Sequence, residues 1–272
     1  MAPVIVCAGL TTIDIAQAVT ELPSANTKMI AEDAWLDVGG PAANAARVAQ
    51  RHGCEVRLVT ALGDSELATI ARQRLAGIEI IDVAPPSHQL PVSTVFITPD
   101  GSRAVVSRNA TALGAIELPD PAVLDDVKAV LHDGHLLDAS LALAANPAPV
   151  HVLDGGSWKP GLEKLLPMID LAVVSADFAL PGRDADQALS DLSDFGIPRL
   201  VRTRGQEPVQ AMLGGHLELF PVPQVMVVDS TGAGDVLHGS LVAQLAGETD
   251  FTAALRNAIV EASESVTHYR IF

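Results

Sequence analysis

Residues 225–246 have the sequence VMVVDSTGAGDVLHGSLVAQLA, in which a glycine-rich turn joins two apolar runs. The four apolar residues at 225–228 predict a buried strand, and Thr231-Gly232-Ala233-Gly234 predicts a turn into a long helix. Small residues let backbone N–H groups converge on an anion, and the positive end of the helix dipole strengthens that attraction. This segment therefore predicts an anion site at the start of a helix.

Asp235 begins that helix, beside the expected anion site. A carboxylate there would repel a bound phosphate unless it faced an incoming nucleophile, which is where phosphoryl transfer to a hydroxyl needs its general base. The alternative is a glycine-rich turn with Asp235 as an ordinary helix N-cap. The segment is not a P-loop, because no Gly-Lys-Ser/Thr follows the glycines.

The rest of the chain alternates between strand-like and helix-like segments. Strands are expected at 4–10, 28–38, 56–60, 150–153, 171–175 and 200–203, and helices at 42–50, 67–75, 162–169 and 185–194. Residues 91–108, with a turn at Pro99-Asp100-Gly101, and residues 210–220 predict antiparallel hairpins. This pattern predicts one α/β domain with a parallel sheet and a small second sheet.

Composition excludes several classes of protein. The 272 residues include 17 Lys and Arg against 33 Asp and Glu, which gives a formal net charge of −16. Such an acidic chain repels phosphate backbones, so we expect no nucleic-acid partner. The two cysteines, Cys7 and Cys54, cannot build a disulfide framework or a zinc ribbon. The sequence shows no signal peptide and no apolar run of about 20 residues, so we expect a cytoplasmic protein without a membrane partner.

Two further segments carry candidate ligand-binding residues. Gly39 and Gly40 precede a helix and allow a ligand to approach the backbone, and Asn44 in its first turn offers hydrogen bonds to a polyol. Asp14 follows the first strand, where ligands bind in open α/β sheets, and its carboxylate can accept two sugar hydroxyls. The alternatives are an ordinary loop with a first-turn asparagine, and a solvated loop aspartate.

Together these segments resemble the ribokinase/PfkB family of carbohydrate kinases. GGPAANAARVAQRHG at 39–53 is similar to the family's N-terminal motif, and DSTGAGDVLHG at 229–239 to its C-terminal motif. Within the family, the first of these together with LVTALGD and VLDGG resembles ketohexokinases and bacterial sulfofructose kinases. The resemblance implies a ribokinase-like α/β fold over residues 1–272, with a mostly parallel sheet flanked by helices. It also implies a β-sheet lid from segments 12–37 and 91–110.

The resemblance further implies an ATP-dependent kinase that phosphorylates a hydroxymethyl group of a keto sugar. Asp235 would be the catalytic base, and the backbone amides of Gly232, Ala233 and Gly234 would form the anion hole. Asp14, Gly39, Gly40 and Asn44 would hold the sugar. The lid residues Lys28, Arg103 and Arg108 would favour an anionic sugar if they face the pocket, and are otherwise exposed charges.

Cofactors and partners follow from the same resemblance. Thr203, Gly205 and Thr231 would contact the nucleotide, and Asp229 and Thr231 would contribute to a K⁺ site. Mg²⁺ would travel with ATP, and the lid would mediate a homodimer. The segment that closes the adenine pocket in the family would lie beyond Phe272.

His238, one helical turn after Asp235, could tune the base or pack against the lid, and we expect packing.

Two departures from the family pattern leave an alternative open. Residues 175–178 (Ser-Ala-Asp-Phe) stand where many members carry Asn-x-x-Glu, and residues 138–142 lack the arginine with which sulfofructose kinases read a sulfonate. The alternative is a catalytically weak sugar- or nucleotide-binding sensor of the same fold. A nucleoside kinase is disfavoured by the aromatic content of 3%, because base stacking needs aromatic side chains.

Overall fold

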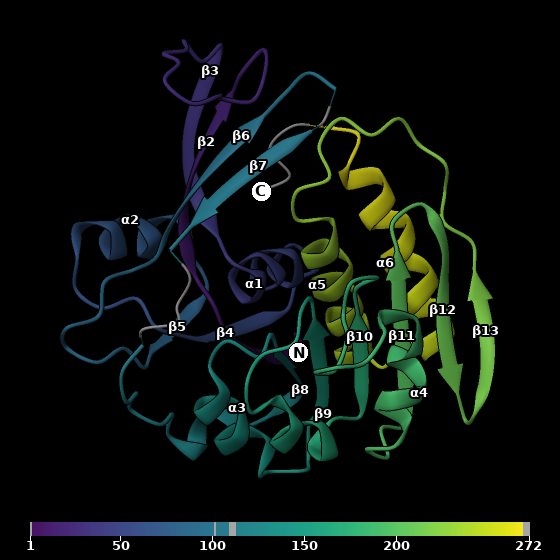
Figure 1. The fold of residues 1–272 in the computed structure, drawn as a ribbon. Helices are drawn as coiled ribbons and strands as arrows, with labels where there is room; N and C mark the ends of the chain where they lie inside the picture. The colour runs from purple at the N-terminus through teal and green to yellow at the C-terminus, as the bar shows by residue number, and fades with distance from the viewer. Residues whose placement is uncertain (1, 101, 109–112, 269–272) are drawn as a thin grey trace.

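The computed structural model describes residues 2–100, 102–108 and 113–268, and a large sheet forms its centre (Figure 1). Its described strands are β1 (Val4–Ala8), β4 (Glu55–Thr60), β5 (Glu79–Asp82), β8 (Val127–His132), β9 (Val150–Gly155), β10 (Leu171–Val174), β11 (Arg199–Arg204), β12 (Glu207–Leu213) and β13 (His216–Phe220). They lie in the order β13-β12-β11-β10-β9-β8-β1-β4-β5. The strands from β11 to β5 are parallel, and the β12–β13 hairpin is antiparallel. The predicted α/β fold with a mostly parallel sheet is confirmed.

Helices cover both faces of this sheet. They are α1 (Pro41–Arg51), α2 (Glu66–Arg74), α3 (Leu137–Ala144), α4 (Ala188–Ser193), α5 (Ala233–Ala246) and α6 (Phe251–Ser265), with 3-10 turns η1 (Pro121–Leu124), η2 (Leu162–Lys164), η3 (Leu166–Met168) and η4 (Ala185–Gln187). Side chains alternate along each strand, so Ile5 and Cys7 pack with α1, α5 and α6 while Val6 and Ala8 pack with α3 on the other face. Burial on both faces explains why the strands are continuous apolar runs in the sequence.

The strand order changes direction beside β1. The chain builds β4 and β5 on one side of β1 and then returns to place β8 on the other side. In open α/β sheets, ligands bind at such a switch point, outside the carboxyl ends of the strands. The fold therefore directs attention to the segments that follow β1 and β8.

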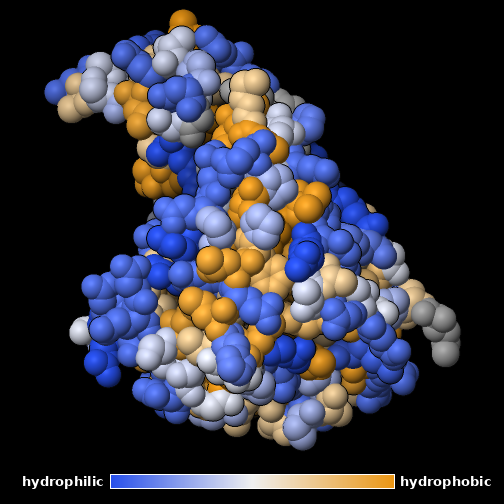
Figure 2. Space-filling view, turned by 90° about the vertical axis from the view of Figure 1, so that its right-hand side faces the viewer, coloured by the Kyte–Doolittle hydropathy of each residue, from blue (hydrophilic) through white to orange (hydrophobic). Residues whose placement is uncertain are grey.

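A second sheet of four described strands contains the segments that we expect to form a lid, and it is called the lid below. The strands are β2 (Thr12–Ala18), β3 (Asp33–Gly39), β6 (Val92–Ile97) and β7 (Arg103–Ser107), in the order β3-β2-β6-β7. The lid rises above the large sheet in Figure 1 and is the upper lobe in Figure 2, where a notch separates it from the body. Ala16, Trp35, Val95 and Ile97 form a small apolar cluster on the lid. Gly101 and residues 109–110 of the expected lid lie outside the described residues.

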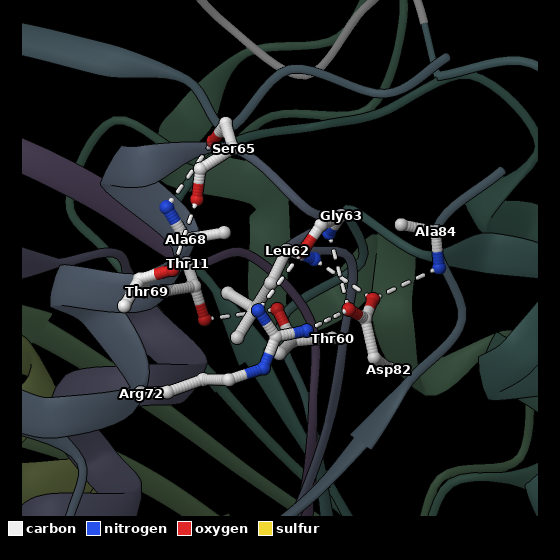
Figure 3. Close-up of polar contacts among 10 residues, drawn as sticks. All are labelled: Thr11, Thr60, Leu62, Gly63, Ser65, Ala68, Thr69, Arg72, Asp82 and Ala84. Carbon is white, nitrogen blue, oxygen red and sulfur yellow. Dashed lines mark hydrogen bonds and ion pairs between the residues drawn. The ribbon is translucent and has the colours of Figure 1, made fainter. Parts of the chain in front are cut away.

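The loop between β4 and α2 is fixed by one carboxylate (Figure 3). Asp82, at the end of β5, accepts hydrogen bonds from the backbone N–H groups of Leu62, Gly63 and Ala84 at 2.9, 3.1 and 3.0 Å. Arg72 of α2 pairs with the same carboxylate at 2.5 Å. The Thr60 hydroxyl also donates to Thr11 Oγ1 at 2.8 Å, just before the lid begins. This corner therefore ties the base of the lid to the large sheet.

Three segments depart from the sequence predictions. Residues 225–228 form no strand, because the β12–β13 hairpin occupies that sheet edge, and the Val228 N–H donates instead to the Val266 carbonyl at 2.8 Å. Residues 162–169 form two 3-10 turns and no α-helix, because Pro167 has no N–H to donate. The strand predicted over 28–38 begins only at Asp33.

Among the described residues, no helix is long and apolar enough to cross a membrane.

Candidate active site

The first turns of α1 and α5 meet at a hydrogen bond between two predicted site residues. The Asn44 side-chain Nδ2 donates to Asp235 Oδ2 at 2.7 Å, across 191 positions of sequence. The helices approach closely because Gly239 faces α1, where a Cβ atom would lie 2.5 Å from the Ala45 carbonyl oxygen and 2.6 Å from Val48 Cβ. The glycine in the C-terminal motif thus lets the N-terminal motif reach the carboxylate.

Asp235 lies in an environment that disfavours its charge. Burial is the largest cause and the charges of Asp154 and Asp133 add to it, which raises the pKa of Asp235 to about 7, although Asn44 and His238 act in the opposite direction. A carboxylate with a pKa near the working pH is suited to general base catalysis. The N-cap of α5 is Gly232, so the alternative in which Asp235 is the N-cap is wrong.

The turn before α5 has the geometry of an anion-binding turn. Gly232 has a φ of 79°, in the left-handed region that favours glycine, and Gly234 is exposed. The Ala233 N–H makes only a long bond of 3.4 Å to the Ser230 carbonyl oxygen. Because the first N–H groups of a helix have no partner within it, this turn can donate to an anion at the positive end of the helix dipole.

A polar cavity of about 470 Å³ lies between the lid and the N-terminus of α1. Its polar lining consists of Asp14, Asp37, Asn44, Arg74, Asp229 and Thr231, and Trp35, Val95 and Ile97 of the lid contribute apolar surface. Three carboxylates and one guanidinium belong to this lining, while Arg47 pairs with Asp37 at 3.3 Å and Arg103 donates to Thr231 at 3.1 Å. The cavity therefore offers many hydrogen-bonding groups to a ligand with several hydroxyl groups.

Asp14 enters the polar cavity through space that a glycine leaves free. A Cβ atom on Gly39 would overlap the Asp14 carboxylate, so no other residue fits at position 39 without displacing that side chain. Gly40 has a φ of 99°, and a Cβ there would overlap the Leu10 carbonyl. Burial, with a smaller contribution from Asp37, raises the pKa of Asp14 above its ordinary value, although the hydroxyl of Thr12 donates to it at 2.7 Å.

Asp133 is a structural residue that the sequence analysis missed. Its buried carboxylate accepts backbone hydrogen bonds from Leu10 at 2.7 Å, Ala42 at 3.3 Å and His135 at 2.9 Å. It thereby joins the end of β8 to the loop after β1 and to the N-terminus of α1. Burial alone would raise the pKa of Asp133, but His135 and these N–H groups hold it below its ordinary value. The only sequence signal was an aspartate directly after an apolar run.

An apolar cavity of about 220 Å³ also borders the turn before α5. It is lined mainly by Val209, Val222, Val225, Val227, Leu237, Ile259, Ala262 and Val266, with Thr203, Gly205, Ser230, Ala233 and Gly234 at its polar edge. Thr203 and Gly205 are two of the residues expected to contact the nucleotide. A flat heterocycle buried here would leave its phosphates beside the N-terminus of α5.

The three lid cations occupy different places. Lys28 is exposed in the segment between β2 and β3, and Arg108 is exposed with its guanidinium 3.4 Å from Gln89 Oε1. Neither is among the described residues that line the polar cavity. Arg103 points across the cleft, and its Nη1 donates to the Thr231 hydroxyl at 3.1 Å. Of the three, only Arg103 reaches the α5 turn.

The expected K⁺ ligands are already used within the protein. Asp229 Oδ1 accepts the N–H of Thr231 at 2.9 Å, and the Thr231 hydroxyl accepts the Arg103 bond. A cation at that hydroxyl would lie against a guanidinium charge. The described residues also include no cluster of three or more His, Cys, Asp or Glu side chains that could hold a metal ion. The K⁺ site therefore remains a prediction, and we assign no step to K⁺.

His238 packs below Asp235 and away from the lid. Its Nδ1 lies 2.7 Å from the Gly234 carbonyl oxygen, and its Nε2 lies 3.2 Å from the Val173 carbonyl oxygen of β10. The packing expected for this residue is found, but against the large sheet, so the expected contact with the lid is wrong. The reason is that α5 packs on β8, β1 and β9 of the large sheet.

Comparison with known proteins assigns the family. The model of the "pfkB family carbohydrate kinase" matches residues 3–270. The chain belongs to the pfkB family of carbohydrate kinases. It is 24% identical to the ribokinase of Bacillus subtilis over 96% of this chain and 92% of that protein. It is also 26% identical to a bifunctional ribokinase/ribose-5-phosphate isomerase A of Fructilactobacillus sanfranciscensis over 84% of this chain, and spans 45% of that longer protein.

A solved structure supports the fold of this pfkB kinase. The Arabidopsis thaliana ribokinase complexed with ribose and ATP superposes with a TM-score of 0.80 at 20% identity, covering 99% of this chain and 94% of that one. The protein is thus a ribokinase-like, ATP-dependent carbohydrate kinase, as the sequence motifs predicted. The ketohexokinase-like subtype remains a prediction.

Proposed function

We propose that this kinase transfers the γ-phosphate of ATP to a hydroxymethyl group of an uncharged keto sugar, with Asp235 as the general base. One observation carries the proposal: residues 229–234, which lead into α5, line both the polar cavity and the apolar cavity. The Asp235 carboxylate is bound to Asn44 of the polar side. The arrangement offers a separate place to each of two ligands, a sugar and a nucleotide, with a base directly after the turn that borders both.

The reaction follows from the groups at that turn. Asp235 removes the proton of the sugar hydroxyl as its oxygen bonds to the γ-phosphorus. The bond from that phosphorus to the bridging oxygen breaks, and ADP leaves with the electron pair. Backbone N–H groups of Gly232, Ala233 and Gly234 stabilise the charge on the transferred group. Mg²⁺ enters with ATP and is held chiefly by phosphates and water.

The sugar is held by hydrogen bonds from its hydroxyls. Asn44 Oδ1 is buried and has no partner among the described residues, so it can accept a hydroxyl proton while Nδ2 holds Asp235. Asp14 offers carboxylate oxygens in the same cavity. An unpaired buried acceptor costs free energy until a ligand satisfies it, which favours a hydroxyl donor at this position.

The charge of the polar cavity favours a neutral sugar. Its lining includes the carboxylates of Asp14, Asp37 and Asp229 and the guanidinium of Arg74. Lys28 and Arg108, which would have favoured an anionic sugar, are exposed elsewhere. We therefore expect sulfosugars and phosphorylated hexoses to bind more weakly than uncharged keto sugars.

Closure of the lid and dimerisation belong to the same proposal. A closed lid would exclude water, which competes with the sugar as phosphoryl acceptor. Ile15, Thr94 and Val106 share one row on the outer face of the lid, and Val106 is 68% exposed. A second lid packing on this apolar row would cover it and form a homodimer.

The test is ADP release from Mg·ATP with fructose, ribose, 2-keto-3-deoxygluconate, sulfofructose and phosphorylated hexoses. Wild type and Asp235→Asn are compared, with Asp138→Asn on the exposed surface of α3 as the matched control. Turnover on an uncharged keto sugar that is lost only in Asp235→Asn supports the proposal. Faster turnover on an anionic sugar contradicts the substrate class.

The sensor of the same fold is the second candidate. Asp177 is exposed and Phe178 is fully buried where the family carries Asn-x-x-Glu, so that segment offers no glutamate to organise Mg·ATP. Calorimetry with fructose and with ADP distinguishes the two functions. Binding of either ligand without turnover on any sugar would favour the sensor.

A further inference from the structure

His238 is buried one helical turn after Asp235, between α5 and the large sheet. It is 6% exposed, and both of its ring nitrogens contact oxygen atoms that have no proton to donate. Nδ1 lies 2.7 Å from the Gly234 carbonyl oxygen, and Nε2 lies 3.2 Å from the Val173 carbonyl oxygen. The Asp154 carboxylate, at the end of β9, is 3.5 Å from the same Nδ1.

Each ring nitrogen thus lies beside an oxygen that can only accept a hydrogen bond. A neutral imidazole carries one N–H and one lone pair, so one nitrogen would point a lone pair at a carbonyl oxygen. The imidazolium donates from both nitrogens and satisfies both carbonyls. A buried imidazolium needs a counter-charge, and Asp154, 8% exposed at its side chain, supplies it. The geometry therefore describes an ion pair below the base.

The ion pair adds no net charge next to Asp235. Without His238, Asp154 would be an unpaired buried carboxylate that repels the carboxylate of Asp235. The other charged group that acts on Asp235 is Asp133, directly after β8, and Asn44 of α1 donates a hydrogen bond to Asp235. Burial and the charge of Asp133 raise the pKa of Asp154, and His238, Lys159 and His135 act in the opposite direction. His238 is the cationic group that α5 itself brings to this cluster.

We propose that His238 is a positioning residue for the base: its imidazolium, paired with Asp154, keeps Asp235 ionised and holds the Gly234 peptide of the anion-binding turn in place. This proposal rests on the kinase function proposed above. Burial and the neighbouring carboxylates already raise the pKa of Asp235 to about 7. Loss of the nearby positive charge would raise that pKa further, so the base would be protonated at neutral pH.

The first test is the pH dependence of kcat/KM for the sugar that gives turnover. In His238→Gln, we expect the acidic limb to move to higher pH by about one pH unit, because an opposite charge has been removed. In Asp154→Asn, the ring should also become neutral, so both charges are lost and the limb should stay close to that of wild type. The double variant restores the charge balance, so its limb should return close to that of wild type. His216→Gln, on the exposed strand β13, is the matched control.

A purely structural role gives a different result. Lower kcat and lower thermal stability in His238→Gln, with an unmoved acidic limb, would overturn the proposal. The double variant keeps the test valid if a single variant unfolds, because it leaves no unpaired buried charge.

The second test needs no turnover. Nuclear magnetic resonance of ¹³C-labelled histidine, with His238→Gln to assign the signal, reports the protonation of the ring at pH 7. An imidazolium signal that becomes neutral in Asp154→Asn supports the ion pair, and a neutral ring in wild type overturns it. If the wild type had no kinase activity on any sugar, the proposed function would fail while the ion pair could still be observed.

Discussion

The polar cavity and the apolar cavity differ in how the chain builds them. Residues of the polar cavity come from the lid, from α1 and α2, and from the turn before α5, between positions 14 and 231. Residues of the apolar cavity all come from positions 203–266. The first depends on hydrogen bonds between side chains on separate elements, whereas the second depends on apolar burial within one local unit. Substitutions should therefore separate sugar recognition from nucleotide recognition, except at the α5 turn.

The largest effect is expected at the carboxylate directly after the turn that borders both cavities. Asp235→Asn should lower kcat by roughly 10²–10⁴-fold, the range for a lost general base, and leave the KM values of sugar and ATP within a few-fold of wild type. Steady-state ADP release measures both. An unchanged kcat would remove Asp235 from the mechanism. A large rise in the KM of the sugar or of ATP would mean that Asp235 also binds that substrate.

The next effect is expected on the polar side alone. Asp14→Ala removes a charged acceptor that serves hydroxyl groups, so kcat/KM for the sugar should fall by roughly 10–100-fold. The KM of ATP should stay within twofold, as measured by varying each substrate at saturation of the other. Glu32→Ala, an exposed carboxylate beside the lid strand β3, is the control. An equal loss for ATP would mean that the two cavities are not independent.

A smaller effect is expected on the apolar side. Ala262→Phe fills part of the apolar cavity, so the KM of ATP should rise by roughly tenfold while the KM of the sugar is unchanged. Ala253→Phe, on the exposed face of the same helix α6, tests for general damage to the helix. If Ala262→Phe leaves the KM of ATP unaltered, the nucleotide binds elsewhere.

The smallest effect is a difference in pH dependence. Asp235 must be ionised to accept a proton, and its pKa is raised to about 7, so kcat/KM for the sugar should fall by about tenfold from its plateau for each pH unit below 7. The apolar cavity contains no such group, so the affinity for ADP should be constant between about pH 6.5 and 8, by calorimetry. A sugar profile that is flat across pH 7 would contradict the raised pKa.

The sequence predicted the sheet because the strands are buried on both faces and therefore form continuous apolar runs, as at Val4–Ala8. It predicted the turn before α5 because that conformation requires glycine at position 232. It failed at 225–228, where apolar residues suggested a strand. That outcome depends on which strands already occupy the sheet edge, and local sequence does not contain this information.

Within the site, residue types were predictable and their contacts were not. Gly39, Gly40 and Asn44 could be singled out as candidates, but the bond from Asn44 to Asp235 depends on a close helix packing that Gly239 permits. Asp133 gave almost no local signal, because its partners are backbone N–H groups of distant segments. The sequence made Lys28 and Arg108 candidates for binding an anionic sugar. In the structure both are exposed, because their orientation depends on how the lid is placed.

Local chemistry thus determined the family, the glycine-rich turn and the choice of Asp235 as the proposed base, since backbone conformation and motif spacing are properties of neighbouring residues. Tertiary structure alone decided what surrounds that base. The raised pKa of Asp235, its bond to Asn44 and the pairing of His238 with Asp154 arise from burial and from charges far apart in the chain. Electrostatic effects depend on distance in space and on exclusion of water, and only the folded chain fixes these two quantities.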